Sequence, residues 1–241
     1  MCTTCGCGLS PSHTDGDGIA GRMIRLERDL LAKNDRYAEQ NRDRFLHHKV
    51  LALNVMSSPG AGKTALLAQT IRELSPEMRI GVVEGDQQTR RDAQRIEAAG
   101  ALAVQINTGK SCHLEAQGVG QALLQLPLMD LDLLFIENVG NLVCPAGFDL
   151  GEQYRIVLVS VTEGDDKPLK YPDMFATADL LVITKLDLLP YVEFSQEQCV
   201  AYARQINPEL NWLGLSSQSG EGMLHWQIWL DQQLTALRTS K

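Results

Sequence analysis

The 241-residue sequence predicts an α/β fold in which a mostly parallel sheet is flanked by helices. From residue 50 onward, seven short apolar runs alternate with segments whose apolar residues recur every three or four positions. Continuously apolar runs are typical of parallel strands, because helices bury both faces of such a sheet. The runs predict strands at residues 50–56, 79–84, 101–106, 131–136, 155–161, 180–184 and 211–215. The segments between them predict helices at residues 64–74, 89–99, 112–126, 196–206 and 222–237.

Two segments precede this α/β domain, which we expect to cover residues 49–241. Residues 1–21 contain mainly Gly, Ser, Thr, Asp, Pro and Cys, so they cannot bury a core and predict a flexible arm. Residues 22–48 combine many charges with apolar side chains at helical spacing, which predicts one amphipathic helix docked on the domain.

Charge and composition argue against several classes of protein. The chain has 22 basic and 30 acidic side chains and a formal net charge of −8, which disfavours nucleic acid as a partner. No apolar run approaches the ~18 residues of a membrane span, so no membrane partner is expected. The first residues lack the basic and apolar regions of a signal peptide, which predicts a cytoplasmic, reducing location. The six cysteines therefore need an explanation other than disulfides.

A glycine-containing loop directly follows the first expected strand and precedes a helix. Residues 57–64 read Ser-Ser-Pro-Gly-Ala-Gly-Lys-Thr, close to G-x-x-x-x-G-K-[ST] but with Ser57 in place of the first glycine. The glycines let backbone N–H groups surround a phosphate, and the helix N-terminus adds positive potential. Lys63 would neutralise the β- and γ-phosphates, and the Thr64 hydroxyl would bind Mg²⁺. The predicted phosphate site consists of Gly60, Ala61, Gly62, Lys63 and Thr64.

The run Thr-Lys-Leu-Asp at residues 184–187 predicts that the nucleotide is GTP. It is similar to the Asn-Lys-x-Asp motif of GTPases, with Thr in place of Asn. The two carboxylate oxygens of Asp187 match the N1 and N2 donors of guanine, whereas adenine presents an unpaired acceptor there. Lys185 would lay its aliphatic stem over the purine. Residues 216–220 occupy the place of the loop that supports the base but lack the lysine often found there.

Two acidic residues end expected strands at the edge of the sheet where open α/β folds bind ligands. Asp86 follows one strand, and Glu137 begins a Glu-Asn-Val-Gly run similar to the Asp-x-x-Gly switch of GTPases. In that switch the N–H of Gly140 would contact the γ-phosphate. We expect Asp86 and Glu137 to hold Mg²⁺ and, with Lys63 and Thr64, to form the catalytic set. No arginine finger or water-positioning glutamine can be identified, which predicts slow hydrolysis.

Three of the six cysteines lie within the first seven residues. Cys2, Cys5 and Cys7 can converge on one ion, and the intervening glycine permits a tight backbone. Thiolates favour zinc, nickel or copper(I) over magnesium or calcium. A Cys-x-x-Cys redox pair is the alternative, but such pairs open a helix after a strand, and neither is expected here.

A second metal site is expected inside the domain. Cys112 and His113 are adjacent at the start of an expected helix, and Cys144 lies seven residues after Glu137 in an expected loop. A lone buried cysteine is usually a small hydrophobic residue, which is our interpretation of Cys199. Cys112 and His113 cannot both face a core, and Cys144 continues the switch-like segment. We therefore predict that Cys112, His113 and Cys144 bind a metal.

Several of these motifs together resemble the HypB family, the nickel-inserting GTPases of [NiFe]-hydrogenase maturation. The resemblance covers the arm and nearly the whole domain. The residues that carry it are 2–7, 57–64, 84–86, 109–114, 137–145 and 162–168. It implies a SIMIBI-class P-loop GTPase that forms a nucleotide-dependent homodimer, binds nickel at the N-terminal cysteines and binds nickel or zinc at the internal site.

The resemblance also implies partners, namely a HypA-type metallochaperone, a SlyD-type prolyl isomerase and the hydrogenase large subunit. Some family members carry a histidine-rich stretch after the arm; this sequence has none, which weakens a nickel-storage role.

Three alternatives remain at this stage. The related urease GTPase UreG carries a Cys-Pro-His motif, whereas Cys112 and His113 are adjacent here and a cysteine triplet is present. A passive nickel store or a redox switch would require a vestigial phosphate loop. A P-loop small-molecule kinase is disfavoured, because residues 184–187 favour guanine and no acceptor-substrate motif is found.

Overall fold

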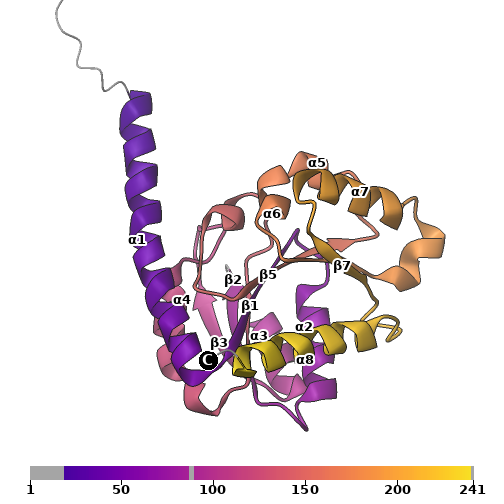
Figure 1. The fold of residues 1–241 in the computed structure, drawn as a ribbon, viewed down its shortest axis with the longest axis horizontal. Coiled ribbons are helices and arrows are strands. Elements are labelled where there is room, and N and C mark those ends of the chain that lie inside the picture. The colour runs from indigo at the N-terminus through magenta and orange to yellow at the C-terminus, as the bar shows by residue number, and fades with distance from the viewer. Residues whose placement is uncertain (1–18, 87–89, 240–241) are drawn as a thin grey trace, which may run out of the picture.

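The computed structural model describes residues 19–86 and 90–239, in which seven strands form one parallel sheet (Figure 1). The strands are β1 (Leu51–Ser57), β2 (Ile80–Asp86), β3 (Leu102–Asn107), β4 (Leu133–Glu137), β5 (Tyr154–Ser160), β6 (Leu180–Thr184) and β7 (Asn211–Gly214). Their order is β3-β2-β4-β1-β5-β6-β7, and every neighbouring pair is parallel. All seven predicted strands are found, and the predicted fold class is confirmed.

Helices cover both faces of the sheet, as continuously apolar strands require. One face packs against α2 (Lys63–Leu74), α3 (Arg91–Ala99) and α8 (Met223–Thr239). The other packs against α1 (Ile19–His48), α4 (Ala116–Ala122), α6 (Pro172–Ala176) and α7 (Gln196–Ile206). Successive residues of β1 point to opposite faces, so Leu53 and Val55 lie in the first core while Ala52 and Met56 lie on the other face.

Polar bonds fix the long helix α1 to the domain. Its N-terminal part projects beyond the rest of the molecule, and its C-terminal part lies beside α4 (Figure 1). Phe45 is fully buried, and Asn34 and Asn41 are buried polar residues. Asn34 donates to the carbonyl of Asp149 at 2.7 Å and accepts from the N–H of Ala116 at 2.8 Å, while Asn41 donates to the Ala116 carbonyl at 2.8 Å. The predicted amphipathic helix is therefore present and tied to the start of α4.

The predicted helix at residues 112–126 is wrong at both ends. The α-helix begins at Ala116 and ends at Ala122, so Cys112 and His113 lie in a loop before it. This loop is held by other bonds: the Leu114 N–H donates to the side chain of Asn138 at 3.1 Å, and the Asn141 amide donates to the Cys112 carbonyl at 3.3 Å. A helix that starts at residue 112 would need the Ala116 N–H to donate to the Cys112 carbonyl, but that N–H donates to Asn34 and that carbonyl accepts from Asn141.

Several short elements were not predicted, because three to six residues are too few to show a helical period. They are α5 (Lys167–Lys170), α6, and the 3-10 helices Leu128–Asp130, Cys144–Gly147 and Leu186–Tyr191, whereas the 3-10 helix Leu123–Gln125 continues α4 within the predicted helix. The predicted arm, with Cys2, Cys5 and Cys7, lies outside the described residues.

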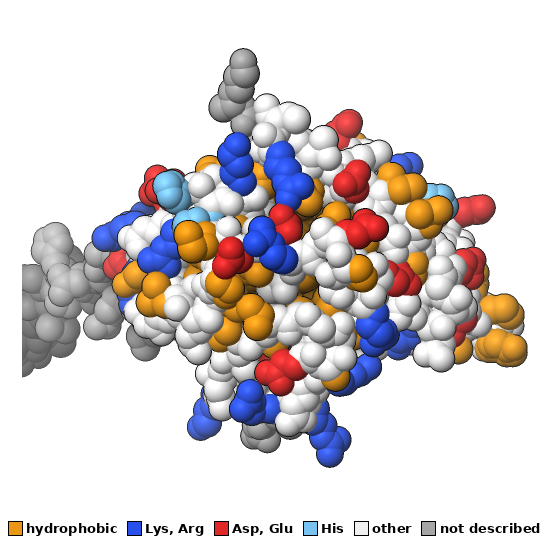
Figure 2. Space-filling model, turned by 90° about the horizontal axis from the view of Figure 1, so that it is seen from below, with side chains coloured by type: hydrophobic (Ala, Val, Ile, Leu, Met, Phe, Trp, Pro, Cys, Tyr) orange, Lys and Arg blue, Asp and Glu red, His pale blue; other side chains and the backbone are white. Residues whose placement is uncertain are grey.

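No helix within residues 19–86 and 90–239 is long and apolar enough to cross a bilayer. On the face drawn in Figure 2, Lys and Arg side chains lie among Asp, Glu and hydrophobic side chains. That face therefore lacks the continuous basic stripe that is typical of proteins binding a phosphate backbone.

Candidate functional site

A cavity of about 630 Å³ lies at the edge of the sheet where β1, β2 and β4 end. Parallel strands bring their carboxyl ends to one edge, so segments far apart in sequence meet there. The predicted residues that line the cavity are Gly60, Gly62, Lys63, Thr64, Asp86, Cys112, Glu137, Gly140 and Lys185. Ala61 and Asp187 do not line it, and His113 and Cys144 line a neighbouring groove instead.

The loop at residues 57–64 has the backbone of a phosphate-binding loop. Gly60 and Gly62 have φ angles of 77° and 103°, a region that favours glycine. The Lys63 ammonium donates to Ser57 Oγ at 3.0 Å, so the serine that replaces the usual glycine holds the lysine across the loop. Burial lowers the pKa of Lys63. Burial removes water from the Lys63 ammonium, and a negatively charged ligand would stabilise its charge instead.

The run at residues 184–187 lies directly beside this loop. Thr184 Oγ1 donates to the Ala61 carbonyl at 2.6 Å, so the threonine found in place of the usual asparagine supports the phosphate loop. Lys185 has a φ of 61°, an unusual conformation for a non-glycine residue, and its stem approaches Gly62. The hydroxyl of Ser216 donates to the Asp187 carboxylate. The predicted base-supporting loop therefore contacts the predicted base reader.

Two buried glutamates face the cavity from neighbouring strands. Glu84 of β2 and Glu137 of β4 are register partners, and their exposed fractions are 2% and 4%. Thr64 Oγ1 donates to Glu137 Oε1 at 2.7 Å. The Oε2 atoms of both glutamates lack a hydrogen-bond partner within the described part of the chain. The sequence motifs do not mark Glu84 as a site residue, although Glu84 and Asp86, two positions apart in a strand, must share one face.

Burial shifts both glutamates toward the neutral form. It raises the pKa of Glu84 to about 8, with a further contribution from the charge of Glu137. Burial also raises the pKa of Glu137 to about 7, against the opposing effects of Lys63 and of the bond from Thr64. A hydroxyl beside buried carboxylates is the hard-oxygen donor set that Mg²⁺ prefers. The residues present therefore fit this ion.

Two further segments contact the phosphate loop. Gly140 lies against Pro59, because an added Cβ would come within 2.9 Å of the Pro59 Cα. Lys167 donates to Ser58 Oγ at 3.1 Å and lies 3.4 Å from a carboxylate oxygen of Glu163. Lys167 was not predicted as a site residue, although it lies in the run at residues 162–168 that carries the family resemblance. The segment after β4 and the start of α5 thus lie next to the phosphate site.

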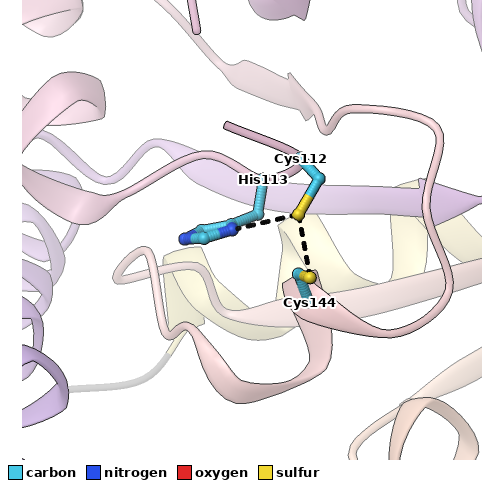
Figure 3. A group of neighbouring side chains, drawn as sticks. All are labelled: Cys112, His113 and Cys144. Carbon is cyan, nitrogen blue, oxygen red and sulfur yellow. Dashed lines mark hydrogen bonds between the residues drawn. The ribbon is translucent and has the colours of Figure 1, made fainter. Parts of the chain in front are cut away.

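Cys112, His113 and Cys144 come together as predicted (Figure 3). The two Sγ atoms are 2.8 Å apart, Cys112 Sγ lies 3.9 Å from His113 Nδ1, and one donor atom from each residue lies within 4.8 Å of the others. The His113 ring stacks on Phe148, with 3.9 Å between ring centroids. Burial lowers the pKa of His113, which favours the neutral imidazole that binds metals. The bond with Cys144 and burial raise the pKa of Cys112.

Asn138 connects this thiol cluster to the nucleotide cavity. It follows Glu137, lines the cavity and is 1% exposed. Its Oδ1 accepts from the Leu114 N–H at 3.1 Å, two residues after Cys112. Its Nδ2 donates to Asn54 Oδ1 of β1 at 3.2 Å. One buried amide therefore contacts both the strand of the phosphate loop and the loop carrying two of the three cluster residues.

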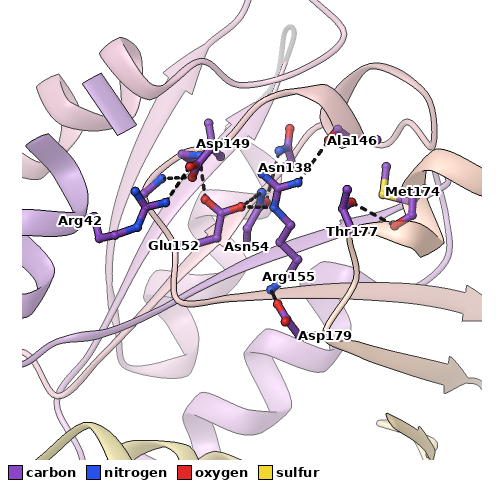
Figure 4. A network of polar contacts seen from close by, with 12 residues as sticks. Arg42, Asn54, Asn138, Ala146, Asp149, Glu152, Arg155, Met174, Thr177 and Asp179 are labelled. Atoms are coloured by element: carbon purple, nitrogen blue, oxygen red, sulfur yellow. Dashed lines mark hydrogen bonds and ion pairs between the residues drawn. The ribbon is translucent and has the colours of Figure 1, made fainter. Parts of the chain in front are cut away.

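The same network continues to the turn that carries Cys144 (Figure 4). Asn54 donates to Glu152 Oε1 at 3.1 Å, and Arg155 Nε donates to the same oxygen at 2.8 Å. Arg155 Nη1 then donates to the Ala146 carbonyl at 3.1 Å. Both halves of the thiol cluster are thus fixed to one chain of polar groups, in which Asn138, Asn54 and Glu152 are buried and Arg155 is partly exposed.

The raised pKa of Glu84 predicts a pH-dependent stability of the protein without metal or nucleotide. Between the pKa of Glu84 in the unfolded chain, near 4.5, and its folded pKa of about 8, the side chain is ionised in the unfolded protein but protonated in the folded one. Folding therefore takes up a proton, and the free energy of unfolding decreases as pH rises through that range. Glu84→Gln should therefore stabilise the protein by about 4 kcal/mol at pH 8, because each pKa unit of the shift corresponds to ~1.4 kcal/mol. At pH 5 the gain should stay below ~1 kcal/mol. Urea unfolding at the two pH values measures the difference.

The exposed residue Glu77, changed to Gln, is the control and should show no such dependence. A gain from Glu84→Gln that is equal at pH 5 and pH 8 would contradict the assignment of the raised pKa to Glu84.

Comparison with known proteins agrees with this geometry. Residues 51–214 match the family described as the CobW/HypB/UreG nucleotide-binding domain. The hydrogenase maturation factor HypB of Azotobacter vinelandii is 54% identical over 227 residues, which cover 94% of this chain and 75% of the relative.

Two solved structures are also similar. HypB from Helicobacter pylori in complex with nickel is 40% identical, with a TM-score of 0.81 over 87% of this chain and 98% of that one. HypB from Archaeoglobus fulgidus is 42% identical, with a TM-score of 0.79 over 84% of this chain and 99% of that one. The chain therefore belongs to the HypB family of hydrogenase maturation factors.

Proposed function

We propose that this protein hydrolyses GTP and uses the nucleotide cycle to bind nickel and deliver it to the large subunit of a [NiFe]-hydrogenase. The observation that carries the proposal is the position of Cys112. This residue lines the nucleotide cavity and also lies in the thiol and imidazole cluster with His113 and Cys144. A metal at the cluster and a nucleotide in the cavity would share a wall. Similarity to a HypB structure in complex with nickel supports nickel as the cargo.

The residues around the cavity have separate roles in this proposal. Lys63 and the backbone of Gly60, Ala61 and Gly62 bind the phosphates, and Asp187 and Lys185 hold the guanine. The Thr64 hydroxyl and Glu137 hold Mg²⁺, with Asp86 at the end of the next strand. When bound, Mg²⁺ neutralises charge on the phosphate oxygens. The sequence motifs identify no arginine finger, so we expect slow turnover and infer that the protein works as a timer.

The cluster of Cys112, His113 and Cys144 binds nickel or zinc, and the N-terminal Cys2, Cys5 and Cys7 bind nickel. Thiolates with a neutral imidazole are ligands that suit both ions. We place this activity in the cytoplasm, where thiols remain reduced. A nucleotide-dependent homodimer, a HypA-type metallochaperone and a SlyD-type prolyl isomerase are the partners that family membership suggests.

The alternative from a different class is a passive metal store or thiol redox switch. It is favoured by the close approach of Cys112 and Cys144, whose Sγ atoms are 2.8 Å apart. It does not account for the phosphate loop, in which two glycines adopt positive φ angles around a desolvated lysine. GTP turnover that is lost in Lys63→Ala supports the proposed function, and its absence in the unsubstituted protein supports the store.

The first prediction of this proposed function concerns recognition of the base. Asp187→Asn should exchange guanine for xanthine recognition, because the new amide NH₂ can pair with the xanthine carbonyl that replaces the guanine amine. A mismatched buried polar group costs ~1–3 kcal/mol, so GDP affinity should fall about tenfold or more. Fluorescence titration with GDP and XDP measures both affinities in one variant. Unchanged GDP affinity would remove Asp187 from the base site.

The second prediction separates the arm from the domain. Replacing Cys2, Cys5 and Cys7 with Ser should abolish the tighter nickel site and leave GTP hydrolysis nearly intact, because a Gly- and Ser-rich tether transmits little strain. The readout is the sulfur-to-nickel charge-transfer absorption of a square-planar species. Replacing Cys112 and Cys144 is the reciprocal control and should preserve that band. A band that survives the triple replacement would place the site elsewhere.

The third prediction couples the internal metal to the nucleotide. A γ-phosphate held by the segment after Glu137 would act on Asn138, which bonds to the loop after Cys112, and on the turn carrying Cys144. Nickel(II) often prefers planar and zinc(II) tetrahedral ligands, so a shift of one thiolate should alter nickel affinity more than zinc affinity. A coupling of ~1–3 kcal/mol corresponds to roughly 5- to 150-fold.

Nickel titration of the Cys2, Cys5 and Cys7 triple variant with GDP and with a non-hydrolysable GTP analogue measures this coupling. Linkage requires nickel to change the ratio of nucleotide affinities by the same factor. Equal nickel affinities in the two nucleotide states would reduce the internal site to a structural one.

A further inference from the structure

The cavity contains more carboxylates than the proposed roles use. The acidic side chains that line it are Glu84, Asp86, Asp92 and Glu137, and the basic ones are Lys63, Arg95 and Lys185. A bound nucleotide would add several negative charges. A site with this balance needs additional positive charge, and a divalent cation supplies it most compactly.

Glu84 is a buried acidic residue of this cavity to which the proposed function assigns no role. It is 2% exposed, and its Oε2 has no hydrogen-bond partner within the described residues. A buried polar atom without a partner is costly, and the cost is larger for a charged group. The residue cannot easily turn away, because Gly85 packs closely on the other side of the strand, where an added Cβ would lie 2.7 Å from Leu114 Cδ2. Strand β2 therefore holds Glu84 on the cavity side.

Glu137 presents the same features on the neighbouring strand. Glu84 and Glu137 are register partners in β2 and β4, so their side chains project from adjacent positions on one face of the sheet. Glu137 uses Oε1 to accept from Thr64, and its Oε2 also lacks a partner within the described part of the chain. Two adjacent carboxylates, each with one unpaired oxygen, thus lie beside a hydroxyl. Oxygen donors of these types in this arrangement suit a divalent cation.

We propose that Glu84 is a ligand of the divalent cation in this cavity and shares the ion with Glu137 and Thr64. The inference rests on the proposed function, because it concerns the Mg²⁺ of that nucleotide site. It adds a carboxylate that the phosphate-loop and switch-like motifs do not include. Binding of the ion gives both unpaired oxygens a partner and compensates the excess of acidic side chains over basic ones.

The test uses the full-length protein with GDP and Mn²⁺ as the probe of the cation site. Electron paramagnetic resonance of free Mn²⁺ gives its affinity without requiring turnover. Glu84→Gln keeps the size of the side chain but removes its charge, and should weaken Mn²⁺ binding about tenfold or more, since a charge-assisted contact contributes ~1.5–3 kcal/mol. GDP affinity in EDTA should stay equal or improve, because one negative charge leaves the cavity. Glu137→Gln should also lose Mn²⁺.

Asp92→Asn is the matched control, because it removes one negative charge from the same cavity at a position on α3 that is half-buried and paired with Arg95 at 3.7 Å. Its effect on Mn²⁺ affinity should stay below threefold. Equal losses in Asp92→Asn and Glu84→Gln would show a general charge effect and overturn the proposal. Glu84→Asp, in which the carboxylate is retained but retracted, should bind Mn²⁺ better than Glu84→Gln.

The outcomes separate this inference from the proposed function. Mn²⁺ affinity that is unchanged in Glu84→Gln but lost in Glu137→Gln overturns the role of Glu84 alone. An unsubstituted protein whose GDP binding ignores Mn²⁺ rejects both the cation site and the role of Glu84. If Glu84→Gln does not give the native circular dichroism spectrum, Glu84→Ala decides, and Mn²⁺ affinity of that variant within twofold of the unsubstituted protein overturns the proposal.

Discussion

The position of β4 between β1 and β2 determines where every group of the candidate site lies. Parallel pairing brings the carboxyl ends of these strands to one edge, where the phosphate loop follows β1 and where Asp86 and Glu137 end β2 and β4. The register pairs Glu137 with Val55 of β1 on one side and with Glu84 of β2 on the other. A shift of β4 by one residue would turn the Glu137 side chain to the opposite face. The bond to Thr64 at 2.7 Å would then be lost.

This arrangement places charged groups where the protein alone stabilises them poorly. Burial lowers the pKa of Lys63 and raises those of Glu84 and Glu137, so each group is shifted toward its neutral form. Such pKa shifts are typical of functional sites, because a bound ligand can supply the opposite charge that the folded protein alone does not. A phosphate would favour the charged lysine, and a cation would favour the charged glutamates. The two ligands would therefore support each other's binding through the residues between them.

The sequence predicted the sheet well because buried parallel strands leave a strong signal. Residues 196–206 were predicted as a helix and form one with the same ends, Gln196–Ile206. The loop at Cys112 was predicted as helical because its backbone bonds to Asn138 and Asn141 come from more than twenty residues away, and local patterns carry no such information. The role of Ser57 as a partner of Lys63 was missed for a similar reason, since the motif marks it only as a departure. The convergence of Cys112, His113 and Cys144 was predicted from residue type. The distances between their donor atoms could not be predicted, because they depend on how the fold places two separate loops.

The two proposed metal sites lie close together and are distinguished by ligand chemistry. The cavity presents carboxylate and hydroxyl oxygens, which suit Mg²⁺, whereas the neighbouring cluster presents two thiols and an imidazole, which suit nickel or zinc. Asn138 lies between them and offers only amide atoms, which are already bonded to Leu114, Val139 and Asn54. Neither ion therefore finds a competing ligand there. The same amide is hydrogen-bonded on both sides, so a displacement of the segment after Glu137 would act on the loop that carries Cys112. Selectivity and the proposed coupling would then have the same structural origin, a buried side chain that binds no metal itself.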